Sequence, residues 1–226
     1  DCGQESMLRA PGFIKELHER LRNIKPELFI LNEGDPRAYE EVNFYEFGDA
    51  AYSWKLNSEW GDGGEGLPGI YKGVYSVDQL HDLIVAGIPA DKGLIMNYAN
   101  IGYHDFLHIR YGWEQERSAL ALVTTTYGLV NIRAGEEVGA ARINGMFDFS
   151  DPLGTLPLYK RLIKARKLLS GNYPVIERIT ENIPSDAYAY TSKNKGEILF
   201  TVINFKDQPA TIAFDLNSTV FEGSGK

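Results

Sequence analysis

Carboxylate side chains follow two apolar stretches of the chain, at positions where a buried strand would end. Glu33 comes after residues 28–31, which are apolar at every position, and Asp105 stands beside His104 after the apolar residues 94–96. Asp1 would occupy an equivalent place if a strand preceded it. Because the carboxyl ends of parallel strands meet at one edge of a sheet, where catalytic groups stand, we predict that these three carboxylates converge.

Carboxylates gathered at one rim suit the hydrolysis of glycosidic bonds. A retaining mechanism needs one carboxylate as nucleophile and one carboxylic acid as proton donor, about 5 Å apart. Neighbouring negative charge favours the protonated form of the acid near neutral pH. Aromatic side chains can stack on the flat, apolar faces of sugars, and Tyr52, Trp54, Trp60 and Tyr71 are candidates, with ordinary packing as the alternative for each.

The elements that would position these groups alternate between strands and helices in the first three quarters of the chain. Apolar residues at helical spacing predict helices over residues 11–25, 76–85, 114–126 and 156–169. Short apolar runs predict strands over residues 28–32, 44–48, 93–98 and 129–132, with a glycine-rich loop over 57–69. From about residue 174 the period becomes two, which predicts antiparallel strands over 187–190, 198–203 and 210–214. The chain is therefore predicted to be an α/β unit followed by a small antiparallel β domain.

Composition and charge exclude several classes of function. The chain has 226 residues and a net charge of −8, so no basic surface is expected to bind nucleic acid. Cys2 is the single cysteine, which rules out an intrachain disulfide and a cysteine-based zinc site. No apolar run has the roughly 18 residues that a membrane span needs. His104 and His108 stand four residues apart without an HExxH pattern, and we predict no metal site.

Several of these segments together resemble the α-amylase family of glycoside hydrolases. Residues 30–33, Ile-Leu-Asn-Glu, resemble the strand-five motif, in which the Glu is the general acid/base. Tyr103-His104-Asp105 resembles the strand-seven motif, which usually reads Asn-His-Asp. Residues 47–56 resemble the strand-six region, and residues 119–139 and 147–169 resemble the segments that close the barrel.

The resemblance implies a fold and a set of roles. Residues 1–172 would form the C-terminal half of a (β/α)8 TIM barrel, and residues 173–226 would begin an antiparallel β-sandwich domain. Asp1 aligns with the nucleophile, Glu33 with the acid/base and Asp105 with the carboxylate that stabilises the transition state, while His104, Tyr52 and Trp54 would bind the sugar. The substrate would be an α-glucan or oligosaccharide, and the N-terminal half of the barrel would come from the same or another chain. No cofactor is implied, although the complete protein could bind calcium.

Two departures from the family pattern keep other functions open. Tyr103 replaces the usual Asn, and residues 127–130 lack the prolines that usually precede strand eight. These changes suit a catalytically impaired, amylase-like subunit that binds carbohydrate or acts as a scaffold. A third possibility keeps the chemistry but replaces water with a sugar acceptor, which gives a transglycosylase or isomerase.

Overall fold

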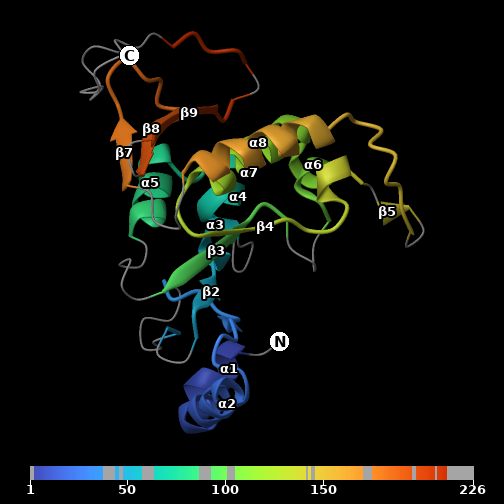
Figure 1. Cartoon of the computed structure of the whole chain (residues 1–226). Coiled ribbons are helices and arrows are strands. Elements are labelled where there is room, and N and C mark those ends of the chain that lie inside the picture. Colours follow the sequence, from blue (N-terminus) through green and yellow to red (C-terminus); the bar gives the residue numbers. More distant parts are fainter. Residues whose placement is uncertain are drawn as a thin grey trace.

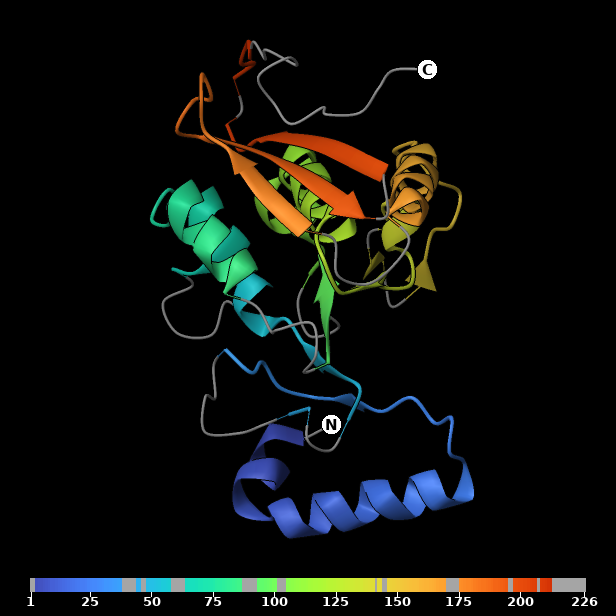
Figure 2. The same cartoon turned by 60° about the vertical axis from the view of Figure 1, so that its left-hand side comes forward.

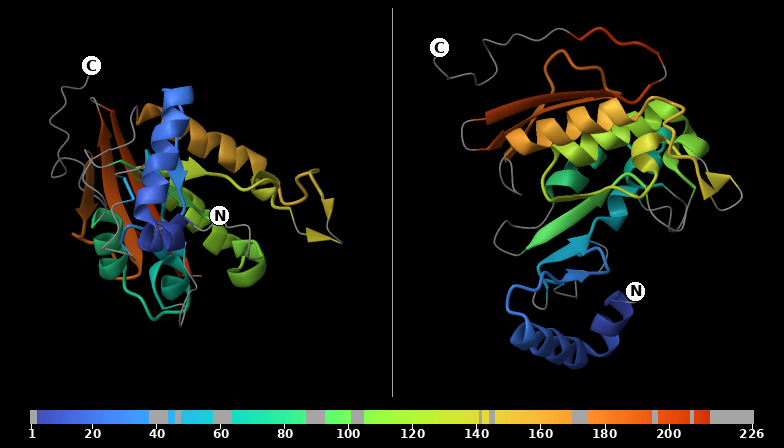
Figure 3. Two further views of the ribbon diagram at one scale, coloured as in Figure 1. Left: turned by 90° about the horizontal axis from the view of Figure 1, so that it is seen from below. Right: turned by 45° about the vertical axis from the view of Figure 1, so that its right-hand side comes forward.

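The computed structural model describes residues 3–37, 44–45, 48–57, 64–86, 93–100, 105–140, 142–143, 146–169, 175–194, 197–206 and 208–212. Its architecture is mixed α/β, with a parallel sheet in the middle of the molecule and a separate antiparallel sheet at one end (Figure 1). Helices α1 (Gly3–Arg9) and α2 (Pro11–Ile24) form the opposite end, as Figure 2 and the right-hand view of Figure 3 also show.

Four short parallel strands make up the central sheet, in the order in which they occur along the chain. They are β1 (Leu31–Asn32), β2 (Ala50–Tyr52), β3 (Leu94–Tyr98) and β4 (Leu129–Asn131). Gly128 leads into β4 at a φ of 95°, and a Cβ there would lie 2.2 Å from the carbonyl oxygen of Ile95. Glycine therefore lets β4 approach β3 closely enough to pair.

Helices connect and cover these strands. They are α3 (Trp54–Asn57), α4 (Gly66–Tyr71), α5 (Val77–Val85), α6 (Leu107–Tyr111), α7 (Trp113–Thr125), the 3-10 helix η2 (Glu136–Val138) and α8 (Leu156–Leu168). Helix α5 begins with the predicted capping box, in which Ser76 accepts from the Gln79 amide and the Gln79 side chain accepts from the Ser76 amide. A two-stranded hairpin of β5 (Arg142–Ile143) and β6 (Met146–Phe147) precedes α8.

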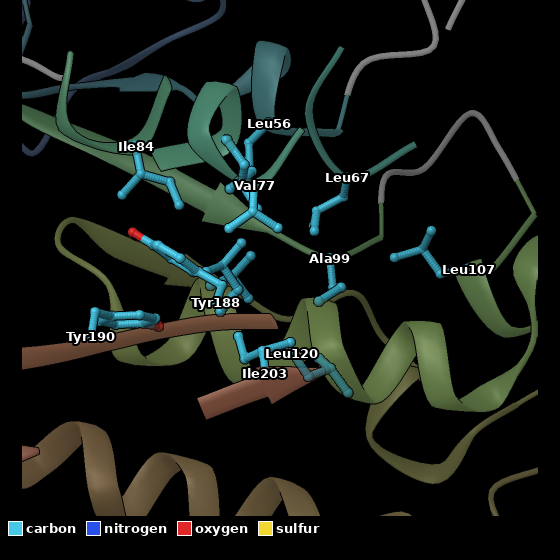
Figure 4. Packing of buried hydrophobic residues seen from close by; sticks show 14 of the residues in the cluster. Leu56, Leu67, Val77, Ile84, Ala99, Leu107, Leu120, Tyr188, Tyr190 and Ile203 are labelled. Carbon is cyan, nitrogen blue, oxygen red and sulfur yellow. The ribbon is translucent and has the colours of Figure 1, made fainter. Parts of the chain in front are cut away.

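The antiparallel sheet packs against the helices that follow the parallel strands. It contains β7 (Val175–Ile179), β8 (Ala187–Asn194) and β9 (Glu197–Asn204). Tyr188 and Ile203 of this sheet share one buried cluster with Val77 and Leu120, as Figure 4 shows. The hydroxyl groups of Tyr190 and Thr125 lie 2.5 Å apart and link β8 to α7. The sheet and the α/β part therefore share a core, and the boundary near residues 172–173 stays a prediction.

Periodicity located most of the long elements correctly. The predictions of the helices that became α2, α5, α7 and α8, and of the strands that became β3, β4, β8 and β9, are confirmed. Helices α1 and α6 and strand β7 were not foreseen. Their apolar patterns are too short to distinguish a helix from a strand, so the segments that pack against them decide which one forms.

Four predicted strand or loop segments differ from the structure. The strand expected at 28–32 is regular only at Leu31–Asn32, and the strand expected near 44–48 lies instead at Ala50–Tyr52. The expected loop at 57–69 contains the start of α4. Residues 210–212 of the last expected strand are not in a strand, and residues 213–214 lie outside the described residues.

Helix α2 buries little of its apolar face. Met7 of α1, Ile14 of α2, Phe44 and Ala51 form a small buried cluster beneath the two helices. The apolar residues at helical spacing that predicted α2 lie on another side of the helix. Among them, the side chains of Phe13 and Ile24 are 64% and 83% exposed. Helical spacing thus predicted the helix correctly but did not reveal how little of this face the described residues cover.

Candidate active site

Glu33 lies directly after β1, where the backbone makes a turn that requires glycine. Gly34 has a φ of 150°, and a Cβ at this residue would come within 2.1 Å of the Phe44 ring. The Asn32 side chain donates to the Phe44 carbonyl oxygen over 2.7 Å, which holds the end of β1 against the same segment. The position of Glu33 is thus fixed by its neighbours on both sides, and its side chain is half-buried.

A group of aromatic side chains lies at the same edge of the sheet as Glu33. Tyr52 ends β2, and its ring centroid lies 6.3 Å from that of Trp54 and 6.3 Å from that of Tyr98 at the end of β3. Burial raises the pKa of Tyr52, and the negative charge of Glu33 raises this pKa further. Glu33 and the aromatic pair of Tyr52 and Trp54, which were predicted from the sequence, thus follow or end neighbouring strands at one edge of the sheet.

The strand register explains why these residues meet. Asn32 pairs with Ala51, and Tyr52 pairs with Met96, so the carboxyl ends of β1, β2 and β3 lie side by side. Ligands of parallel α/β proteins bind at this edge. The edge presents a carboxylate and aromatic rings, which suits a sugar better than a phosphate.

A buried ion pair follows Glu33 and was not found from the sequence. Asp35 is fully buried and Arg37 is 10% exposed, and their closest atoms lie 2.7 Å apart. Desolvation opposes the charge of Arg37, but the adjacent Asp35 more than offsets it, so the pKa of Arg37 lies above its usual value. An Asp before a proline signals a turn, but nothing in the local sequence shows that the pair is buried.

Asp105 lies beyond β3 and just before α6, with an exposed side chain. Two buried side chains hold the segment that follows Asp105 by hydrogen bonds of 2.7 Å. The Asn100 side chain accepts from the Leu107 amide, and the Glu116 carboxylate accepts from the His108 amide. Glu116 also contacts His108 Nδ1 at 2.7 Å. His108 thus pairs with a buried carboxylate. The convergence of Asp105 with Glu33 stays a prediction.

A third buried carboxyl group, that of Glu136, stands in η2. Burial raises the pKa of Glu136 to about 8, and the negative charge of Glu116 contributes to the rise. The Glu136 carboxylate accepts a hydrogen bond from the Arg133 amide over 2.9 Å. Its complete burial favours a structural role over contact with a ligand.

Three candidate site residues, Asp1, Trp60 and His104, lie outside the described residues, and their roles stay predictions. Among the described residues, no group of three or more His, Cys, Asp or Glu side chains could hold a metal ion. In the same part of the chain, every helix is too short or too polar to cross a membrane.

Sequence comparisons find no match, whereas structural comparison finds proteins of similar fold. No family model matches the chain, and no curated protein matches it. A cyclomaltodextrinase superposes on 86% of this chain with a TM-score of 0.69 and 16% sequence identity. A noncanonic maltogenic alpha-amylase from Thermotoga neapolitana covers 86% with a TM-score of 0.66 and 16% identity. A cyclic alpha-maltosyl-(1→6)-maltose hydrolase from Arthrobacter globiformis covers 83% with a TM-score of 0.63 and 15% identity.

These similarities confirm the predicted resemblance to α-amylase family enzymes at the level of the fold. The chain spans 35%, 45% and 44% of the length of these three proteins.

Proposed function

We propose that this chain belongs to a retaining glycosidase of the α-amylase type, which cleaves α-glucosidic bonds in starch-like α-glucans or maltooligosaccharides. The observation that supports the proposal most directly is that Glu33 follows β1 and Tyr52 ends β2 at the carboxyl edge of the parallel sheet, near enough for the charge of Glu33 to raise the pKa of Tyr52. The fold supports it, because the similar solved structures include enzymes whose names refer to maltose and maltodextrin.

The proposed chemistry divides between carboxylates on separate segments. Asp1 would attack the anomeric carbon, while Glu33 would protonate the leaving oxygen and then activate the water that releases the sugar. Asp105 and His104 would hold sugar hydroxyls and strengthen these hydrogen bonds in the transition state. The rings of Tyr52 and Trp54 would offer flat apolar surfaces against which a glucose unit stacks.

The proposed architecture is the C-terminal half of a (β/α)8 barrel over residues 1–172, followed by the start of a β-sandwich domain. β1 stands at the edge of the described sheet, and the stripe of Phe13 and Ile24 on α2 is exposed. The missing half of the barrel, from the same or another chain, would pair with this edge and cover this stripe. Calcium could bind to the complete protein.

The test uses the complete protein and compares two glutamates that flank β1. We expect Glu33→Gln to lower kcat for maltooligosaccharides by about 10²–10⁴, because the general acid/base is lost. Glu27→Gln is the matched control, since Glu27 is exposed on the other side of β1, and this change should leave kcat unaltered. Correct folding of both variants is checked by circular dichroism.

The outcome also separates the alternatives. A wild-type protein that binds α-glucans and aryl maltosides but hydrolyses neither is the carbohydrate-binding subunit, and the enzyme proposal is then wrong. Longer oligosaccharides appearing at the expense of free sugar would instead indicate a transglycosylase. NMR can determine the anomeric configuration of the first product. Retention of the α configuration supports the double displacement.

A further inference from the structure

The Asp35 carboxylate connects the turn that carries Glu33 to the segment that follows β2. Its Oδ1 accepts from the Arg37 amide and from Arg37 Nε, each over 2.9 Å. Its Oδ2 accepts from Arg37 Nη2 and from the Lys55 amide, each over 2.7 Å. Four donors thus converge on one fully buried carboxylate, and the Lys55 amide comes directly after Trp54.

Arg37 extends the same connection to two further elements. Nη2 also donates to the Ser53 hydroxyl over 2.7 Å, and Nη1 donates to the Leu83 carbonyl oxygen of α5 over 3.0 Å. A planar guanidinium holds its donors in a fixed fork, so these contacts define a direction as well as a charge. Lysine cannot reproduce this set of contacts.

The position of this pair links it to the aromatic group of the proposed site. Ser53 and Lys55 alternate with Tyr52 and Trp54 along the chain, and Asp35 lies two residues after Glu33. The turn between Glu33 and Asp35 cannot relax freely, because Gly34 lies against the Phe44 ring. A shift of the Asp35–Arg37 pair would therefore move Glu33 relative to Tyr52.

A contribution to stability does not by itself explain why Asp35 and Arg37 are buried as an ion pair. Two charges lose hydration when they are buried, and replacing a buried ion pair with apolar side chains is often neutral or stabilising. The pair does, however, define one geometry for the two backbone segments that it joins. We propose that Asp35 and Arg37 are positioning residues, which hold Glu33 in register with Tyr52 and Trp54 for proton donation to the leaving oxygen. This inference rests on the proposed function.

The test compares two substrates that differ in their leaving group, because a positioning role affects them differently and a loss of folding affects them equally. An aryl maltoside with a strongly acidic phenol needs little protonation as it leaves, whereas phenyl maltoside depends on the general acid. In the complete protein, we expect Arg37→Lys to lower kcat/KM for phenyl maltoside by about 10- to 100-fold, the scale of a misplaced catalytic group. For the aryl maltoside with the strongly acidic phenol, the activated maltoside, kcat/KM should fall by less than about three-fold.

A second arginine, in helix α2, offers a matched control. Arg22 donates to Asp49 over 2.9 Å, and Asp49 accepts from the Ile30 amide at the other end of β1. Arg22→Lys should leave both kcat/KM values within about two-fold of wild type, because this pair lies away from the proposed site. Asp35→Asn provides a second variant of the buried pair, with the same expected preference for the activated substrate.

The results have distinct meanings. An equal loss with both maltosides, in proportion to the loss of folded protein, would overturn the positioning role and leave a structural one. Unchanged kinetics of Arg37→Lys with phenyl maltoside would overturn it as well. A wild-type protein that hydrolyses neither maltoside overturns the proposed function, and with it this inference.

Discussion

The two ends of the molecule bury their apolar side chains to different degrees. At one end, α5, α7, α8 and the antiparallel sheet share a large cluster in which Leu122, Tyr188 and Tyr190 are fully buried. At the other end, within the described ranges, α1 and α2 share only the small cluster around Ile14, and Phe13 and Ile24 are largely exposed. Similar amphipathic patterns therefore contribute very different amounts to stability, because only burial removes apolar surface from water.

The strongest test of this difference makes one substitution at both ends. Leu122→Ala should lower the free energy of unfolding by about 2–5 kcal/mol, because it leaves a cavity in a packed core. Leu17→Ala on α2 removes the same atoms from a side chain that is 39% exposed, and it should cost less than about 1 kcal/mol. Urea unfolding followed by circular dichroism measures both, and equal losses would contradict the comparison.

The second test uses pH, which should change the free energy of unfolding through the buried carboxyl group of Glu136 in η2. Burial raises the folded-state pKa of Glu136 from 4.5 to about 8. The folded state therefore keeps a proton that the unfolded state releases, so the stability present below about pH 4.5 is lost as the pH rises towards 8. The loss is on the order of 1.4 kcal/mol per pH unit within this window.

Glu136→Gln removes this titration while it retains an oxygen that can accept from the Arg133 amide. The difference in unfolding free energy between variant and wild type should therefore shift in favour of the variant as the pH rises from about 5 to about 8. Urea titrations across this range measure the shift. A difference that stays constant with pH would show that Glu136 does not hold a proton in the folded protein.

The smallest expected effect concerns how helices begin at the two ends. Helix α5 starts with a capping box at Ser76, whereas the residue before α2, Ala10, offers no side-chain cap. Ser76→Ala should cost about 1 kcal/mol, because the Gln79 amide loses its acceptor. Ser76→Asp keeps an acceptor and should remain close to wild type in the same unfolding measurement. If both variants lost the same stability, the cap would not be the cause.

Local sequence determined much of the site but not its buried support. Glu33 was predicted because a charge directly after an apolar run marks the end of a strand, and the aromatic Tyr52 and Trp54 were candidates by type alone. The sequence did not indicate the burial of Asp35, since that depends on Lys55 and on Arg37, whose reach to α5 is set by tertiary packing. Nor could it decide the position of Asp105 relative to Glu33, which stays a prediction.

The sequence by itself determined where the long helices and the late strands lie, because their apolar periods of about 3.6 and two extend over many residues. Only the tertiary structure decided that β2 begins at Ala50, because a short strand is defined by the pairing of its backbone with a neighbour. It also decided that the apolar stripe of α2 is exposed while that of α7 is buried. Periodicity records which face of a helix is apolar, but burial depends on which other segments lie against that face.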